Sequence, residues 1–260
     1  MRFLVTFAVE AEFAPWRSRH PFVPYEFDDD GRRRDFDLYR ANVNSNEVTV
    51  LLTGMGGENA TNAMRTISLE LMDVCIVTGL AGALDASLKP GTIVAGRRCE
   101  ALSQDLKIAS DAGLVDFAVA AGARAMDVFL TSETILSTAE EKRTLTTSGS
   151  VVEMESAHVL AVAFRSQVPA LAVRAISDAA DEDLPVDFEQ ILDSRGHLRV
   201  GRLLKELAFE PHRLPLLVRF GRQSRRAAWS LADFLDQYIP MVAAKWHCVR
   251  ASSIAEVTAT

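Results

Sequence analysis

Short apolar strands alternate with helical segments throughout residues 1–182, and no other feature of the sequence restricts the fold as much. The strands are short runs of β-branched, aromatic and aliphatic residues, whereas the helices carry apolar residues at helical spacing. Such alternation predicts one α/β domain with a largely parallel central sheet. Strands are expected at 2–9, 38–43, 47–52, 74–77, 90–94, 125–130, 151–152 and 170–176, and helices at 58–71 and 156–166.

The C-terminal third of the chain has a different pattern. Three prolines stand among basic and leucine-rich stretches at 183–225, and a closing helix is predicted at 224–239. We therefore expect a single domain over 1–240 with an extended helical segment at 183–240, followed by a frayed tail at 241–260. One face of the closing helix is expected to carry Ala228, Leu231, Leu235 and Tyr238.

Charge and cysteine usage restrict the partners. A formal net charge of −7 argues against a nucleic-acid-binding surface, because neutralising phosphates requires clustered Lys and Arg. The three cysteines have neither metal-ligand nor disulfide spacing, so no metal site is predicted. The sequence shows no signal peptide and no apolar run of about 20 residues that could span a membrane. These features predict a cytoplasmic protein with a small-molecule partner.

Polar residues gather where the predicted strands end. They are Glu12, the glycine turns 53–57 and 78–84, the pair Glu153 and Glu155, and Ser177 with Asp178. A single carboxylate after a strand is more often a helix cap or a surface group. Because ligands of open α/β sheets bind beyond the carboxyl ends of the strands, the whole set predicts a small-molecule site.

Other kinds of site fit the sequence less well. A Ser-His-Asp triad would need a histidine near a strand end, and His158 falls inside a predicted helix instead. The turn TGMGG at 53–57 is neither a Walker A loop nor a full GxGxxG fingerprint. Neither ATP nor a dinucleotide is therefore expected as a cofactor.

Five motifs carry a resemblance to a known family. AVEAEF (8–13), TGMGG (53–57), TGLAGAL (78–84), VEMES (152–156) and RAISDAAD (174–181) occur in this order. Together they resemble the nucleoside phosphorylase and nucleosidase superfamily, nearest to the 5′-methylthioadenosine/S-adenosylhomocysteine nucleosidases. The resemblance implies a three-layer α/β/α sandwich around a twisted mixed, largely parallel sheet, and a homodimer or larger homo-oligomer. It also implies cleavage of the N-glycosidic bond of a purine nucleoside, with adenine as the base and a 5′-substituent on the sugar.

The resemblance assigns catalytic roles to three residues. Glu12 matches the carboxylate that activates the attacking water, and Asp178 matches the acid that protonates N7 of the purine. Arg174 matches the arginine that supports the water or anion site. Proton transfer to N7 makes the base a neutral leaving group, so neither a metal nor a cofactor is required.

The resemblance also assigns substrate-binding roles. Glu155 matches the group that hydrogen-bonds the ribose 2′-hydroxyl, where its charge would stabilise the developing ribosyl cation. Met154 matches the side chain packed under the sugar, and base-binding backbone groups are expected within 131–136. The further substrate-binding residues predicted are Val9, Leu80, Ala81, Gly82, Ile135, Glu153 and Ser177, the last of which would orient Asp178.

The nucleophile and the C-terminal segment leave alternatives open. Phosphorylases of the superfamily bind phosphate with an arginine and a serine, and this chain has Val77 and Leu80 at those two positions. Water is therefore the favoured nucleophile, and phosphate would be the co-substrate in the alternative reaction.

The segment after 192 resembles hopanoid-associated phosphorylases, which act on a lipid-linked adenosine compound. Its leucines and arginines could contact a membrane surface through 200–239, although a helix packed on the domain is the more ordinary arrangement. A nucleoside-binding protein without turnover is the third alternative.

Overall fold

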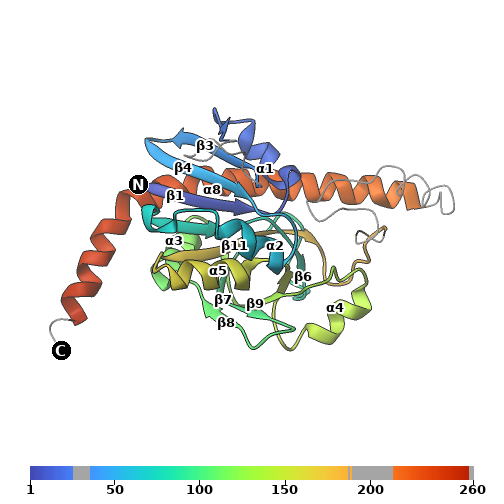
Figure 1. Ribbon diagram of the computed structural model, residues 1–260. Coiled ribbons are helices and arrows are strands. Elements are labelled where there is room, and N and C mark those ends of the chain that lie inside the picture. The colour runs from blue at the N-terminus through green and yellow to red at the C-terminus, as the bar shows by residue number, and fades with distance from the viewer. Residues whose placement is uncertain (26–35, 187, 189–212, 258–260) are drawn as a thin grey trace.

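The computed structural model describes residues 1–25, 36–186, 188 and 213–257. Strands and helices alternate along the chain, as expected for an α/β protein (Figure 1). The strands are β1 (Arg2–Phe7), β2 (Val23–Pro24), β3 (Leu38–Val43), β4 (Asn46–Leu52), β5 (Val74–Val77), β6 (Leu80–Ala83), β7 (Ile93–Ala101), β8 (Lys107–Ala109), β9 (Arg124–Thr131), β10 (Val151–Glu153) and β11 (Ala170–Asp178). The helices are α1 (Glu10–Arg17), α2 (Gly57–Met64), the 3-10 turn η1 (Leu69–Leu71), α3 (Ala112–Ala120), α4 (Ala139–Leu145), α5 (Ser156–Arg165) and α8 (Leu214–Val257).

The described strands form one mixed sheet in the order β2-β3-β4-β1-β5-β11-β6-β10-β9-β7-β8. Parallel pairing joins β4, β1, β5, β11 and β6, whereas β10 runs antiparallel to β6. β11 also pairs with β7, so the strands from β11 to β7 close into a small barrel. The sequence did not predict this closure, because pairing between strands distant in the chain leaves no local signal.

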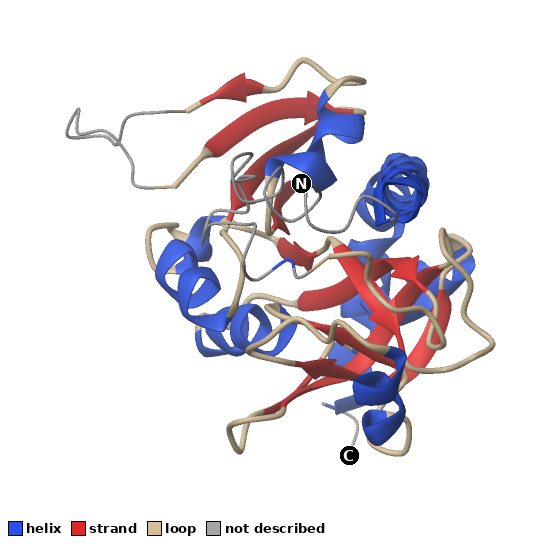
Figure 2. Ribbon diagram, turned by 90° about the vertical axis from the view of Figure 1, so that its right-hand side faces the viewer, coloured by secondary structure: helices blue, strands red, loops and turns tan. Residues whose placement is uncertain are grey.

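Helices cover both faces of the sheet (Figure 2). Alternate residues of β1 enter different cores: Phe3, Val5 and Phe7 pack with α1, α3 and α8, whereas Leu4 packs with α2 and α5. A strand whose successive side chains are all buried requires cover on both faces, since they point to opposite sides. This arrangement confirms the predicted three-layer sandwich.

The closing helix is much longer than predicted. α8 spans Leu214–Val257 and buries the four apolar residues predicted for its inner face. The sequence predicted a frayed tail after Pro240, because the helical pattern is lost there and chain ends are often poorly ordered. Instead the helix continues, because Val242 and Trp246 are buried in the same core. No helix in the described part of the chain has the length and apolar character needed to cross a membrane.

Two local predictions were wrong. The helix expected at 58–71 ends at Met64, where a stretch of Thr66, Ile67 and Ser68, all of modest helix propensity, separates α2 from η1. The glycine turn expected at 78–84 is largely the strand β6, because its small residues allow close pairing with β11 and β10. Much of the segment predicted as helical at 183–240 lies outside the described residues.

Candidate active site

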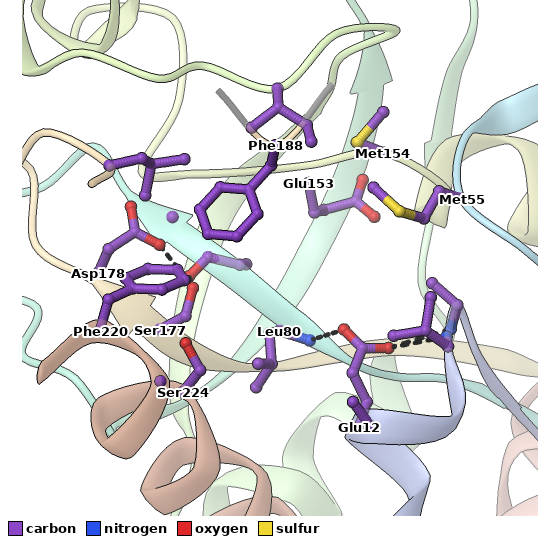
Figure 3. Close-up of a pocket in the computed structure, with 18 of the residues that line it drawn as sticks. Glu12, Met55, Leu80, Glu153, Met154, Ser177, Asp178, Phe188, Phe220 and Ser224 are labelled. Carbon is purple, nitrogen blue, oxygen red and sulfur yellow. Dashed lines mark hydrogen bonds between the residues drawn. The ribbon is translucent and has the colours of Figure 1, made fainter. Parts of the chain in front are cut away.

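A cavity of about 810 Å³ opens where α1, β6, β10, β11 and α8 meet (Figure 3). Eleven of the twelve predicted site residues line it: Val9, Glu12, Leu80, Ala81, Gly82, Ile135, Glu153, Met154, Glu155, Ser177 and Asp178. Arg174 is the exception. The residues that the motifs place far apart in sequence are therefore brought together in one cavity.

Glu12 lies in the first turn of α1 and is held by backbone donors. Its carboxylate accepts hydrogen bonds from the N–H groups of Ala8 (3.1 Å), Val9 (3.4 Å) and Leu80 (2.8 Å). Burial raises the pKa of Glu12, although the Arg174 guanidinium and these N–H groups lower it. A carboxylate with a raised pKa is a better general base near neutral pH.

Gly79 makes this placement of Glu12 possible. Its φ is +145°, and a Cβ atom there would lie 2.9 Å from Glu12 Oε2 and 2.4 Å from Arg174 Nη1. Any side chain would displace both charged groups, so glycine allows the strand to bend beside them.

Arg174 lies beneath the cavity rather than in its lining. Only 1% of the residue is exposed, and its guanidinium donates to the Thr78 carbonyl (3.0 Å) and Ser156 Oγ (3.0 Å) and pairs with Glu155 (3.3 Å) and Glu153. The guanidinium therefore supports the carboxylates that surround it. The resemblance implied that Arg174 supports the water or anion site, and in this geometry such support would act through the carboxylates that the guanidinium holds.

Glu153 also uses its carboxylate inside the protein. It accepts from Thr131 Oγ1 (2.5 Å) and from the N–H groups of Glu155 (3.0 Å) and Ser156 (2.8 Å), besides pairing with Arg174. These bonds fix the turn between β10 and α5. Glu153 lines the cavity as predicted, but its bonds make it an anchor for Glu155.

Glu155 faces the cavity from this turn. Its carboxylate accepts a hydrogen bond from the Gly56 N–H (2.9 Å), which comes from the turn before α2. Burial raises the pKa of Glu155 to about 7; the Arg174 guanidinium opposes this shift and the Glu153 carboxylate adds to it. Met55 and Met154 lie on the same side of the cavity (Figure 3).

The raised pKa of Glu155 predicts a pH-dependent stability. In the unfolded chain this carboxyl ionises near pH 4.5, whereas in the folded protein it ionises near 7. Its protonated form therefore stabilises the fold at low pH, and this contribution is lost as the pH rises from about 4.5 to about 7. Glu155→Gln cannot ionise, so its melting temperature relative to wild type should be higher at pH 8 than at pH 5. Calorimetry at both values measures this, with the exposed Glu70→Gln as control; an unchanged difference for Glu155→Gln would contradict the prediction.

Ser177 and Asp178 both line the cavity, although they are neighbours in a strand. Successive side chains of a regular strand point to opposite faces. Here β11 is irregular between Ile176 and Asp178, and such a bulge re-aims the side chains that follow it. Ser177 Oγ lies 2.5 Å from Asp178 Oδ1 and 3.1 Å from the Ala81 carbonyl oxygen.

Sequence analysis missed Lys142. It belongs to α4, is 1% exposed, and donates to Asp178 Oδ2 at 2.5 Å. A lysine within AEEKRTL resembles the solvated face of a short helix. It is buried because it packs against the end of β11 and the loop that follows.

The cavity also has an apolar wall, whose residues were not among the predicted site residues. The ring centroids of Phe188 and Phe220 lie 5.2 Å apart, and both side chains line the cavity (Figure 3). Leu217, Ser224 and Trp229 of α8 line it as well. Across residues 1–25, 36–186, 188 and 213–246, no three His, Cys, Asp or Glu side chains cluster as a metal site would require.

The chain is similar to known proteins both in sequence and in fold. The model of the phosphorylase superfamily matches residues 2–208. The 5′-methylthioadenosine/S-adenosylhomocysteine nucleosidase of Staphylococcus saprophyticus is 25% identical over 197 residues, which cover 65% of this chain and 86% of that protein.

Solved structures show the same fold. The Campylobacter jejuni 5′-methylthioadenosine/S-adenosylhomocysteine nucleosidase superposes with a TM-score of 0.68 at 17% identity, over 92% of this chain and 98% of that one. A futalosine hydrolase mutant of Helicobacter pylori gives 0.66 at 18% identity, over 91% and 99%. The Neisseria meningitidis nucleosidase in complex with methylthio-immucillin-A gives 0.65 at 22% identity, over 90% and 98%.

Proposed function

The chain belongs to the phosphorylase superfamily, and from this premise we propose that it hydrolyses the N-glycosidic bond of an adenine nucleoside that carries a 5′-substituent. The relative from Staphylococcus saprophyticus is named for 5′-methylthioadenosine and S-adenosylhomocysteine, which are nucleosides of this kind. The observation that carries the proposal is that Glu12, Glu155 and Asp178 line one cavity.

Three carboxyl groups fit this reaction because breaking the C1′–N9 bond separates charge. The sugar becomes positive, and the Glu155 carboxylate would stabilise it only in the transition state. The base becomes negative, and a proton delivered through Asp178 would neutralise it. Glu12 would remove a proton from the water that attacks C1′.

Water is favoured over phosphate because the cavity offers few cations. Among the described lining residues, the lysine and arginine side chains are those of Lys142 and Arg225. Lys142 is paired with Asp178, and the Arg174 guanidinium is bonded to Glu153, Glu155 and Ser156. A phosphate dianion would lack the charge-assisted partners that bind it strongly.

The apolar wall favours a large 5′-substituent. Phe188, Leu217, Phe220 and Trp229 could bury more apolar surface than a methylthio group presents. This wall is the observation that supports the alternative substrate, a lipid-linked adenosine compound cleaved by phosphate. Leu214 and Leu216 are about half exposed on α8 and would permit the membrane contact considered for 200–239.

Adenine release tests the proposal. We expect release from 5′-methylthioadenosine in phosphate-free buffer, with no increase when phosphate is added. Strict dependence on phosphate would identify a phosphorylase, and binding without release would identify a nucleoside-binding protein. Repeating the assay with 5′-alkylthioadenosines of increasing chain length shows whether the apolar wall lowers KM for the larger substrates.

Family membership also supports three proposals, about the oligomeric state, the cellular location and the cofactor requirement of the protein. We propose a homodimer or larger homo-oligomer in the cytoplasm, with neither metal nor organic cofactor. Light scattering coupled to size-exclusion chromatography measures the assembly, and activity after dialysis against a chelator measures the metal requirement.

A further inference from the structure

Lys142 is a buried cation whose partners are all within the protein. Its ammonium group donates to Asp178 Oδ2 (2.5 Å), to the Ala179 carbonyl (2.9 Å) and to the Glu182 carbonyl (2.8 Å). An ammonium group has three N–H donors, and these acceptors use all three. The same three contacts would also form if a protonated Asp178 donated to a neutral amine, but the charge-assisted pair of ammonium and carboxylate is the stronger arrangement, and we take it as the resting state.

The surrounding elements hold this pair in place. Thr138 and Glu141 form a capping box at the start of α4, in which Thr138 Oγ1 accepts from the Glu141 N–H at 3.2 Å. The Ala139 N–H donates to Asp183 at 2.7 Å, and the Leu184 N–H donates to the Ser137 carbonyl at 2.8 Å. α4 is thus fastened to the loop after β11, which fixes the distance between Lys142 and Asp178.

The ion pair between Lys142 and Asp178 determines which of the two groups carries the proton that the departing base needs. In the ion pair, the Asp178 carboxylate accepts a hydrogen bond from the Lys142 ammonium group and carries no proton of its own. The proton nearest to the carboxylate is on Lys142 Nζ. Lys142 also lines the cavity, which brings this proton close to the place where Asp178 would meet the base.

We propose that Lys142 and Asp178 act as one acid unit, in which Lys142 supplies the proton that Asp178 passes to the departing purine. An N–H bond of Lys142 breaks as the Asp178 carboxylate takes the proton, and Asp178 delivers its proton to N7 as a new N–H bond. The electron pair of the C1′–N9 bond goes to the base. The attacking water forms the C1′–O bond and gives a proton to Glu12. Glu12 then releases this proton to solvent, and Lys142 takes one back from solvent. Lys142 is in this scheme a positioning and proton-supplying residue, and the inference rests on the proposed function.

Two leaving groups test the unit. Adenine needs a proton to depart, whereas 4-nitrophenolate does not, so we compare 5′-methylthioadenosine with 4-nitrophenyl 5-methylthioriboside. Lys142→Met should lower kcat for adenine release by about 10²-fold or more, within the range for a lost acid. KM should change little, and the rate on the nitrophenyl riboside should match wild type. Glu140→Gln, which alters an exposed side chain of the same helix α4, should behave as wild type on both substrates.

A double variant separates this role from a structural one. If Lys142 acts through Asp178, then Asp178→Asn/Lys142→Met should be no slower than Asp178→Asn, because the second change removes nothing further. If Lys142→Met does not fold, Lys142→Gln replaces it, since the amide keeps two N–H donors but has no proton to transfer. Equal losses on both substrates, a change in KM alone, or additive losses in the double variant would overturn the inference.

The same assays distinguish this inference from the proposed function. Wild-type protein that releases no adenine would overturn both. Release by wild type, with loss in Asp178→Asn but not in the Lys142 variants, would overturn the acid unit alone and leave the hydrolysis of adenine nucleosides standing.

Discussion

Asp178→Asn is expected to lower kcat for adenine release from 5′-methylthioadenosine by about 10²–10⁴-fold, the usual contribution of a general acid. Asparagine has nearly the same shape and can still accept the hydrogen bond from Lys142, but it cannot pass a proton to N7. Binding should persist, because the cavity and its apolar wall do not change. Steady-state assays give kcat and KM, and circular dichroism reports whether the fold is kept.

Leaving-group dependence makes this prediction specific. The same variant should cleave the 4-nitrophenyl riboside at nearly the wild-type rate, because that leaving group needs no proton. Asp181→Asn provides a matched control, since Asp181 is exposed in the loop that follows β11. Full activity of Asp178→Asn on the adenine nucleoside would refute the assignment of Asp178 as the acid.

The sequence predicted the residues of the site better than the strands and strand pairings around it. Glu12, Glu155 and Asp178 could be predicted because each follows or ends a strand. The order of the motifs linked these three residues, and strand pairing brings them together in the fold. β6 was mistaken for a turn because two glycines in seven residues suggest a turn unless the neighbouring strands are known. Barrel closure by β11 and β7 depends on long-range pairing, which no local pattern records.

Buried charges were the hardest residues to assign. Lys142 and Arg174 are each 1% exposed, yet lysine and arginine are usually solvated, and only tertiary contacts show which ones are not. The motif identified Arg174, but the structure places it behind the carboxylates. No motif identified Lys142. The length of α8 was missed for a related reason, because burial of Trp246 outweighs the tendency of Pro240 to end a helix.

Glu12→Gln is expected to slow hydrolysis by a similar factor, about 10²–10⁴-fold, but with the opposite leaving-group pattern. Glutamine cannot take a proton from water, and every substrate needs that step, so adenine and nitrophenyl substrates should lose rate together.

The substitution also affects the fold, and the experiment has to separate the two effects. Both oxygens of Glu12 accept backbone N–H groups, so the glutamine NH₂ would face a donor and leave it unpaired. An unpaired buried donor costs about 1–3 kcal/mol, which thermal melting would detect. Glu10→Gln, in the same turn of α1 and partly exposed, should match wild type in both assays. A folded Glu12→Gln protein with wild-type hydrolysis would contradict the role of Glu12 as base, whereas loss of rate on both substrates, with the folded state retained, would place proton removal from water at this carboxylate.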